Sequence, residues 1–221
     1  MNTLEVLAAG TVPYEEALAW QRQLAEDRIA GRLSHDVLLL LEHPPVVTLG
    51  RNSHAEHLLQ AEGIDVFEVE RGGDVTFHGP GQLVGYPILD LGAYRKDLHW
   101  YLRTLEQALI DALAILDIPA ERRPGFTGVW TRGRKIASIG VHVKQWVTWH
   151  GFALNVTTDL TAFDRIVPCG IAGVEMTSFE KERGTVKGEG ALWDETVRSV
   201  IQGFESAFNL TARQESVTTS A

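Results

Sequence analysis

The chain has 221 residues, of which 44% are hydrophobic and 22% are charged, and its formal net charge is -9. This size suits one domain with a substantial core, and the acidic balance argues against a nucleic-acid partner held by a basic surface. The N-terminus lacks a basic stretch followed by an apolar run, and no apolar stretch approaches the ~20 residues of a membrane span, so we expect a cytoplasmic protein without a membrane anchor.

The first part of the chain alternates apolar runs with helical patterns. Strands are expected at residues 4–8, 37–41 and 46–49, and helices at residues 14–30 and 54–61. Pro13 and the two glutamates that follow Tyr14 suit the first turn of the longer helix, because proline is tolerated there and carboxylates favour the positive helix end.

Residues 71–86 read RGGDVTFHGPGQLVGY, which sets five glycines beside an arginine and a histidine. Glycine permits backbone conformations and close approaches that a Cβ would forbid, while the valines, phenylalanine and leucine between them favour strands. We therefore expect a glycine-rich hairpin whose backbone borders a cavity.

The second half predicts a long helix, a group of strands and a closing helix. A leucine-rich stripe indicates a helix at residues 97–116, strands are expected near residues 127–131, 134–143 and 147–156, and a helix at residues 192–208. Strand groups separated by helices predict an α+β fold with a mixed, largely antiparallel sheet flanked by helices and a small second lobe. We expect a single domain at residues 1–210 and a frayed polar tail at residues 211–221.

Cys169 is the only cysteine, so an internal disulfide is excluded. Pro168 and Gly170 on either side of it indicate an irregular turn, where reactive groups are often presented. A thiol with an ordinary pKa near ~8.5 needs a cation or a base beside it to be a thiolate at neutral pH. The candidates are His78, His142, His150 and Lys135; the alternative is a cysteine that only fills the core.

Lys135 opens a strand-like run in which polar and apolar residues alternate. Period two places it on the same face as Ala137, Ile139 and Val141, which is the apolar face. A lysine on that face is either desolvated or paired with an anion such as a thiolate, unless its side chain reaches water from the strand end.

Two further patterns carry weaker signals. His54 and His57 lie three residues apart on a predicted helix, but no second pair or cysteine cluster completes a metal site, so we expect no metal. A short basic cluster precedes Lys135 and is either a docking patch for an acidic partner or ordinary solvated charge. It consists of Arg122, Arg123, Arg132 and Arg134.

Taken together, the motifs of residues 37–208 resemble the lipoyl(octanoyl) transferases, also called octanoyl-acyl-carrier-protein:protein octanoyltransferases. The resemblance rests on an ordered series: Arg71-Gly72-Gly73, Thr76, His78-Gly79-Pro80-Gly81-Gln82, Gly128-Val129-Trp130, Lys135-Ile136-Ala137-Ser138-Ile139-Gly140, His150-Gly151-Phe152-Ala153-Leu154-Asn155-Val156 and Pro168-Cys169-Gly170-Ile171. It implies the fold of biotin and lipoate protein ligases.

The resemblance also implies the site residues. Cys169 carries the acyl group as a thioester, and Lys135 lowers the pKa of the thiol or removes its proton. The acyl pocket is lined by residues 71–78, 138–140 and 151–153, namely Arg71, Gly72, Gly73, Asp74, Val75, Thr76, Phe77, His78, Ser138, Ile139, Gly140, Gly151, Phe152 and Ala153. We assign its hydrophobic part to Phe77, Ile139 and Phe152, and oxyanion binding to N–H groups near Gly72, Gly73 or Gly170.

The implied activity is transfer of octanoyl from acyl carrier protein to a lysine of lipoyl domains, the first step of protein lipoylation. The implied acceptors are the lipoyl domains of 2-oxoacid dehydrogenases and the glycine-cleavage H protein, and the reaction needs no ATP, metal or other cofactor. Two alternatives stay open: an ATP-dependent lipoate or biotin protein ligase, and a non-catalytic protein that binds acyl groups or lipoyl domains.

Overall fold

The computed structural model describes residues 2–60, 62–171, 173–184 and 189–216. Its main sheet contains β1 (Asn2–Thr11), β2 (Asp36–Glu42), β6 (Gln82–Ile88), β7 (Val129–Thr131), β8 (Arg134–Lys144), β9 (Val147–Asn155) and β10 (Leu210–Ser216). The strand order is β10-β1-β2-β6-β9-β8-β7. β1 pairs in parallel with β10 and β2, and the other neighbours pair antiparallel, which confirms the predicted mixed, largely antiparallel sheet.

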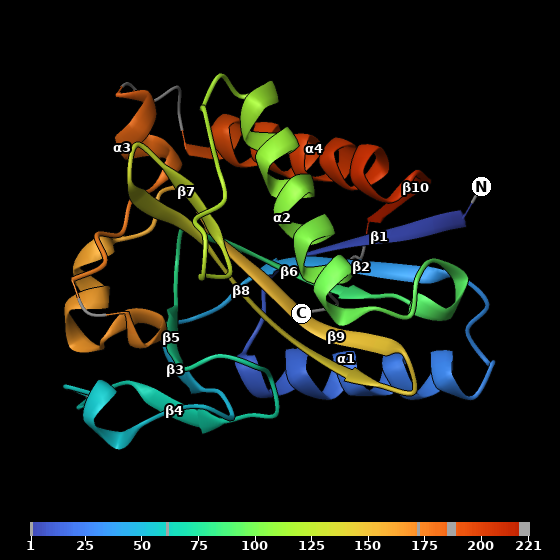
Figure 1. Cartoon of the computed structure of the whole chain (residues 1–221), viewed down its shortest axis with the longest axis horizontal. Helices are drawn as coiled ribbons and strands as arrows, with labels where there is room; N and C mark the ends of the chain where they lie inside the picture. Colours follow the sequence, from blue (N-terminus) through green and yellow to red (C-terminus); the bar gives the residue numbers. More distant parts are fainter. Residues whose placement is uncertain (1, 61, 172, 185–188, 217–221) are drawn as a thin grey trace.

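Helices cover both faces of this sheet. Figure 1 shows α1 (Tyr14–Ile29) beneath the sheet, and α2 (Leu98–Ile115) and α4 (Glu189–Phe208) above it, with the short helix α3 (Phe179–Arg183) at one end. Asp97 caps α2, because its carboxylate accepts the Trp100 N–H at 3.0 Å. Gly203 lets α2 and α4 approach closely, since a Cβ there would lie 2.1 Å from the Ala108 carbonyl oxygen.

The hydrophobic stripe predicted for residues 97–116 contributes to one of the two main cores. On the face covered by α2 and α4, residues such as Leu105, Leu109 and Phe204 pack against Leu38 and Leu154. On the α1 face, a smaller cluster joins alanines of that helix to the buried side chains of β2 and β6 that point towards it. The strands of the main sheet that carry the candidate site are therefore packed on both faces.

A small sheet forms the second lobe, which is at the lower left of Figure 1. It contains β3 (Val46–Leu49), β4 (Asp65–Glu68) and β5 (Val75–His78) in the order β4-β3-β5. The predicted glycine-rich hairpin is wrong: β5 pairs with β3 in the small sheet, whereas β6 pairs with β2 and β9 in the main sheet. The turn through Gly81 therefore carries the chain from one sheet to the other. The Gly81 carbonyl accepts the N–H groups of Val156 and Thr157.

Two other local predictions also need correction. The helix expected at residues 54–61 is a 3-10 turn at Ala55–His57, and Ala61 lies outside the described residues. The tail expected to be frayed from Thr211 instead forms β10, paired with β1 from Asn2 opposite Leu210 to Ala8 opposite Ser216. Backbone hydrogen bonds at a sheet edge do not depend on apolar side chains, so a polar sequence forms a strand there. Residues 217–221 lie outside the described part of the chain.

Candidate active site

Lys135 is buried at the start of β8. Its backbone is fixed on both sides, because its N–H donates to Glu175 and its carbonyl accepts from Thr177. The side chain is 1% exposed, and its ammonium lies 5.3 Å from the centre of the Trp130 ring. Lys135 is therefore buried, together with the next two residues of β8, and the reading in which the side chain reaches water is wrong.

Cys169 occupies a tight turn that neighbouring backbone groups hold in place. Its φ of 56° is left-handed, which is uncommon for a residue with a side chain and occurs where the surroundings fix the backbone. The Val167 N–H donates to the His57 carbonyl, and the Gly170 N–H donates back to Val167. Pro168 starts the turn, so the predicted irregular segment around the cysteine is confirmed.

The two side chains meet. Lys135 Nζ donates a hydrogen bond to Cys169 Sγ at 3.0 Å, and Ser138 Oγ lies 3.7 Å from the same sulfur. Burial by itself raises the pKa of the Cys169 thiol, but the charge and hydrogen bond of Lys135, helped by Ser138 and the Arg71 charge, outweigh it and lower the pKa below its usual value. The surroundings of this half-buried cysteine therefore favour the thiolate form.

The other proposed activators lie elsewhere. His142 hydrogen-bonds the Glu70 carbonyl at 3.0 Å, and His78 hydrogen-bonds Gln82 at 2.8 Å. His150 Nε2 lies 3.8 Å from the Glu70 carboxylate. Of the four candidates, the described structure brings only Lys135 within hydrogen-bond distance of Cys169.

A cavity of about 290 Å³ opens beside this pair, between the main sheet and the small lobe. Of the predicted pocket residues, eleven line it: Arg71, Gly73, Asp74, Thr76, His78, Ser138, Ile139, Gly140, Gly151, Phe152 and Ala153. They come from the segment before and along β5 and from facing positions of β8 and β9, where Ser138 pairs with Ala153 and Ile139 with Phe152.

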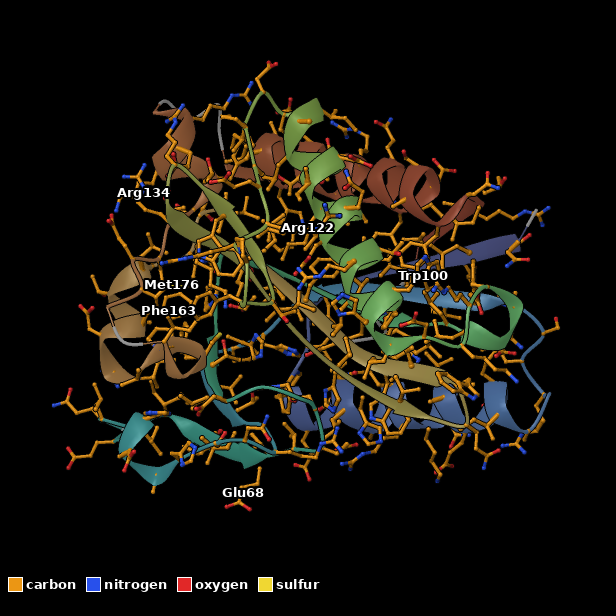
Figure 2. The ribbon with its side chains drawn as sticks, in the orientation of Figure 1. Glu68, Trp100, Arg122, Arg134, Phe163 and Met176 are labelled. Carbon is orange, nitrogen blue, oxygen red and sulfur yellow. The ribbon has the colours of Figure 1, made fainter. Side chains whose placement is uncertain are left out.

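Three predicted lining residues do not face the cavity. Val75 and Phe77 alternate with Asp74, Thr76 and His78 along β5, so their side chains enter the core of the small lobe, where Phe77 stacks edge-on against Phe163. Figure 2 labels Phe163 and Met176 side by side in that core. Gly72 instead packs on β8, and its N–H donates to the Val141 carbonyl.

The cavity also contains residues that were not predicted. Tyr14 at the start of α1, Tyr86 on β6 and Phe126 before β7 line it together with Ile171. Tyr86 donates to His43 at 2.7 Å, because His43 Nδ1 is engaged with the Val12 carbonyl and leaves Nε2 as the acceptor. These residues come from distant segments of the chain, and of the four only Tyr86 belongs to the glycine-rich segment at residues 71–86.

Arg71 places a second cation at the cavity wall. It is 7% exposed and donates to the Thr48 carbonyl and hydroxyl and to the Gly72 carbonyl, all neutral acceptors. Burial lowers its pKa, and the charges of neighbouring groups, Cys169 and Asp74 among them, act in the opposite direction. Arg71 is thus positioned to attract an anion into the cavity.

Two of the three proposed oxyanion donors are already engaged. The Gly72 N–H donates to Val141 at 2.9 Å, and the Gly170 N–H donates to Val167 at 3.0 Å. Within the described residues, Gly73 is the remaining candidate, and it lines the cavity with a φ of 86°.

The basic cluster before Lys135 is not one patch. Arg122 pairs with the buried Glu106 at 3.1 Å, while Arg132 and Arg134 pair with Glu182. Figure 2 shows Arg122 and Arg134 well separated. Only Arg123 of the four forms no ion pair within the described chain; its guanidinium lies 5.2 Å from the Phe126 ring centre. No group of three or more potential metal ligands occurs among the described residues, and none of the described helices is long and apolar enough to cross a membrane.

The fold is similar to that of protein ligases that attach cofactors. A lipoate-protein ligase A bound with ATP superposes with a TM-score of 0.75 over 99% of this chain and 90% of its own, at 18% identity. A biotin protein ligase from Aquifex aeolicus superposes with a TM-score of 0.52 over 93% of this chain and 72% of its own, at 13% identity. At these identities the likeness concerns the fold alone, and it confirms the predicted biotin and lipoate ligase fold.

Sequence relatives are much closer. Residues 13–205 match the lipoyl protein ligase A/B catalytic domain. The octanoyltransferase of Gloeobacter violaceus is 62% identical over 172 residues, which cover 77% of this chain and 78% of the relative. The octanoyltransferase of a Nostoc species is 49% identical over 205 residues, covering 91% and 90%. The chain therefore belongs to the octanoyltransferases of the lipoyl protein ligase A/B catalytic-domain family.

Proposed function

We propose that this protein transfers an octanoyl group from acyl carrier protein to a lysine of a lipoyl domain, in the cytoplasm, through a thioester on Cys169. The observation that carries the proposal is the 3.0 Å contact between Lys135 Nζ and Cys169 Sγ beside a cavity of about 290 Å³. The octanoyltransferase relatives support the same acyl group.

The first half-reaction loads the enzyme. The Cys169 thiolate attacks the carbonyl carbon of the donor thioester, and the bond to the phosphopantetheine sulfur breaks. The departing thiolate takes a proton from the Lys135 ammonium, which becomes a neutral amine. Ile139, Phe152 and Ala153 supply apolar surface for the acyl chain inside the cavity.

The second half-reaction forms the amide. The amine of the acceptor lysine attacks the acyl carbon, the Cys169 thiolate leaves, and neutral Lys135 takes a proton from the attacking nitrogen, which restores the ion pair. Thioester exchange is nearly isoenergetic and amide formation is downhill, so the cycle needs no ATP and no metal. The acceptors are lipoyl domains of 2-oxoacid dehydrogenases and the glycine-cleavage H protein.

A direct assay distinguishes this function from the two alternatives. Octanoyl-acyl carrier protein and an apo lipoyl domain are incubated with the enzyme in the absence of ATP, and the intact mass of the lipoyl domain is measured. The transferase reading predicts one added octanoyl group, which the Cys169→Ala variant does not add. A product that forms only with free octanoate and ATP would indicate a ligase, and no product under either condition would indicate a binding protein.

A further inference from the structure

The proposed reaction leaves one proton unassigned. At neutral pH the acceptor lysine arrives as an ammonium, since its ordinary pKa is about 10.4, and it must lose two protons to become an amide nitrogen. Neutral Lys135 takes one of them when the ion pair with Cys169 is restored. The other proton needs a second acceptor, and a candidate base lies beside Gly170 in the Cys169 turn.

Asp74 supplies the only carboxylate among the described residues that line the cavity. One of its oxygens accepts the Val75 N–H at 2.7 Å, and the other lies 2.6 Å from His57 Nδ1. The Asp74 side chain is 10% exposed and that of His57 is 20% exposed, so both groups are largely buried and the imidazole is the more accessible of the two. A carboxylate that fixes one imidazole nitrogen leaves the other as a base.

This pair lies directly against the residue after the cysteine. A Cβ on Gly170 would lie 2.5 Å from the Asp74 carboxylate and 3.2 Å from His57 Cε1, so only glycine fits at this position. His57 also accepts the Val167 N–H through its carbonyl at 2.8 Å. The imidazole edge next to Nε2 therefore borders the turn that presents the acyl-cysteine.

We propose that Asp74 and His57 receive the acceptor lysine: Asp74 attracts its ammonium, and His57 Nε2 takes one of its protons. The N–H bond breaks with its electron pair left on nitrogen, the neutral amine attacks the acyl carbon, and the imidazolium releases the proton to solvent. This inference rests on the proposed function. It gives the chain two bases near Cys169, of which Lys135 serves the sulfur and His57 serves the incoming amine.

The charged groups around His57 suit this role. His54 is on the same turn, with its ring centre 5.4 Å from that of His57. Arg71 lines the same cavity as Asp74, so its charge offsets part of the carboxylate charge. Arg165, near the turn, is engaged with the Glu62 carbonyl at 3.2 Å.

The test separates the two half-reactions. Octanoyl-enzyme is prepared from wild type and His57→Asn, since the asparagine amide can replace Nδ1–H as the donor to Asp74 but cannot titrate. Discharge of the octanoyl group is followed by intact mass, with either a lipoyl domain or hydroxylamine as acceptor, because hydroxylamine is largely unprotonated at neutral pH. His54→Asn, on the exposed neighbour in the same turn, is the matched control.

We expect His57→Asn to be acylated normally and to discharge to hydroxylamine at the wild-type rate. Transfer to the lipoyl domain at pH 7 should fall about 100-fold, the usual scale of general-base catalysis, and the deficit should shrink as the pH rises towards the pKa of lysine. Equal losses with both acceptors would mean that His57 only positions the turn, and no loss with either would also overturn the inference. If wild type forms no octanoyl-enzyme, the proposed function itself fails.

Discussion

Replacing Lys135 by methionine removes the cation beside Cys169 and nearly preserves the buried volume. At the 3.0 Å separation of Nζ and Sγ, opposite unit charges attract by about 5 kcal/mol at an effective dielectric constant of about 20. Burial raises the pKa of the thiol, so without the ammonium this effect is opposed only by Ser138 and the Arg71 charge, and the pKa rises. Because each ~1.4 kcal/mol is a factor of ten, we expect the thiolate fraction at pH 7 to fall at least about 100-fold even after water relaxes around the site.

The assay is the rate of iodoacetamide alkylation of Cys169 as a function of pH, followed by intact mass. Wild type should react at neutral pH, and Lys135→Met should reach the same rate only at higher pH. Lys144→Met, at the exposed end of the same strand, is the control for a lost lysine charge. Superimposable profiles for wild type and Lys135→Met would refute the ion-pair account of the thiolate.

Three further predictions follow from the packing and the buried charges. Phe152→Ala should improve the use of decanoyl donors relative to octanoyl donors in competition assays, because the ring lines the cavity. The same change should lower the free energy of unfolding in urea by about 3–5 kcal/mol, because the ring is buried. Unchanged discrimination between the two donors would place the acyl chain elsewhere. Glu106→Ala should lower the free energy of unfolding by about 3 kcal/mol, because it removes a fully buried carboxylate that pairs with Arg122 and accepts the Gly128 N–H. A loss below about 1 kcal/mol would contradict this. Burial lowers the pKa of His43 from 6.5 to about 4, so the unfolded chain binds a proton that the folded chain does not, and stability falls as the pH drops from about 6.5 to about 4. In His43→Asn, about 3 kcal/mol of that loss of stability should disappear when urea unfolding is measured across this pH range. An unchanged dependence of stability on pH would argue against a neutral buried imidazole.

Regular elements with a clear period were predictable from the sequence. The apolar stripe of α2 packs against α4 as predicted, and Lys135 is buried as expected, although burial along β8 does not alternate, since residues 135–137 are all buried. Period-two alternation in residues 74–78 predicts two faces for this strand. It separates Thr76 and His78, which line the cavity, from Val75 and Phe77, which fill the small lobe.

Other features depend on long-range pairing and could not be read from local pattern. β10 is polar and becomes a strand because β1 offers an unpaired edge, and β5 and β6 separate because β3 competes for one of them. Tyr14 looks like an ordinary core residue of an amphipathic helix until the fold places it against His78. The arginines before Lys135 suit either a docking patch or ordinary solvated charge by sequence, which does not show that Glu106 and Glu182 pair with three of the four.

The central claim is that Cys169 carries the acyl group. Intact-mass measurement of the enzyme after incubation with octanoyl-acyl carrier protein, without ATP and without an acceptor, tests it most directly. The account predicts that wild type gains one octanoyl group, that peptide mapping places it on Cys169, and that an added lipoyl domain removes it. A protein that stays unmodified yet octanoylates the lipoyl domain, or a Cys169→Ala variant that does so at the wild-type rate, would contradict it.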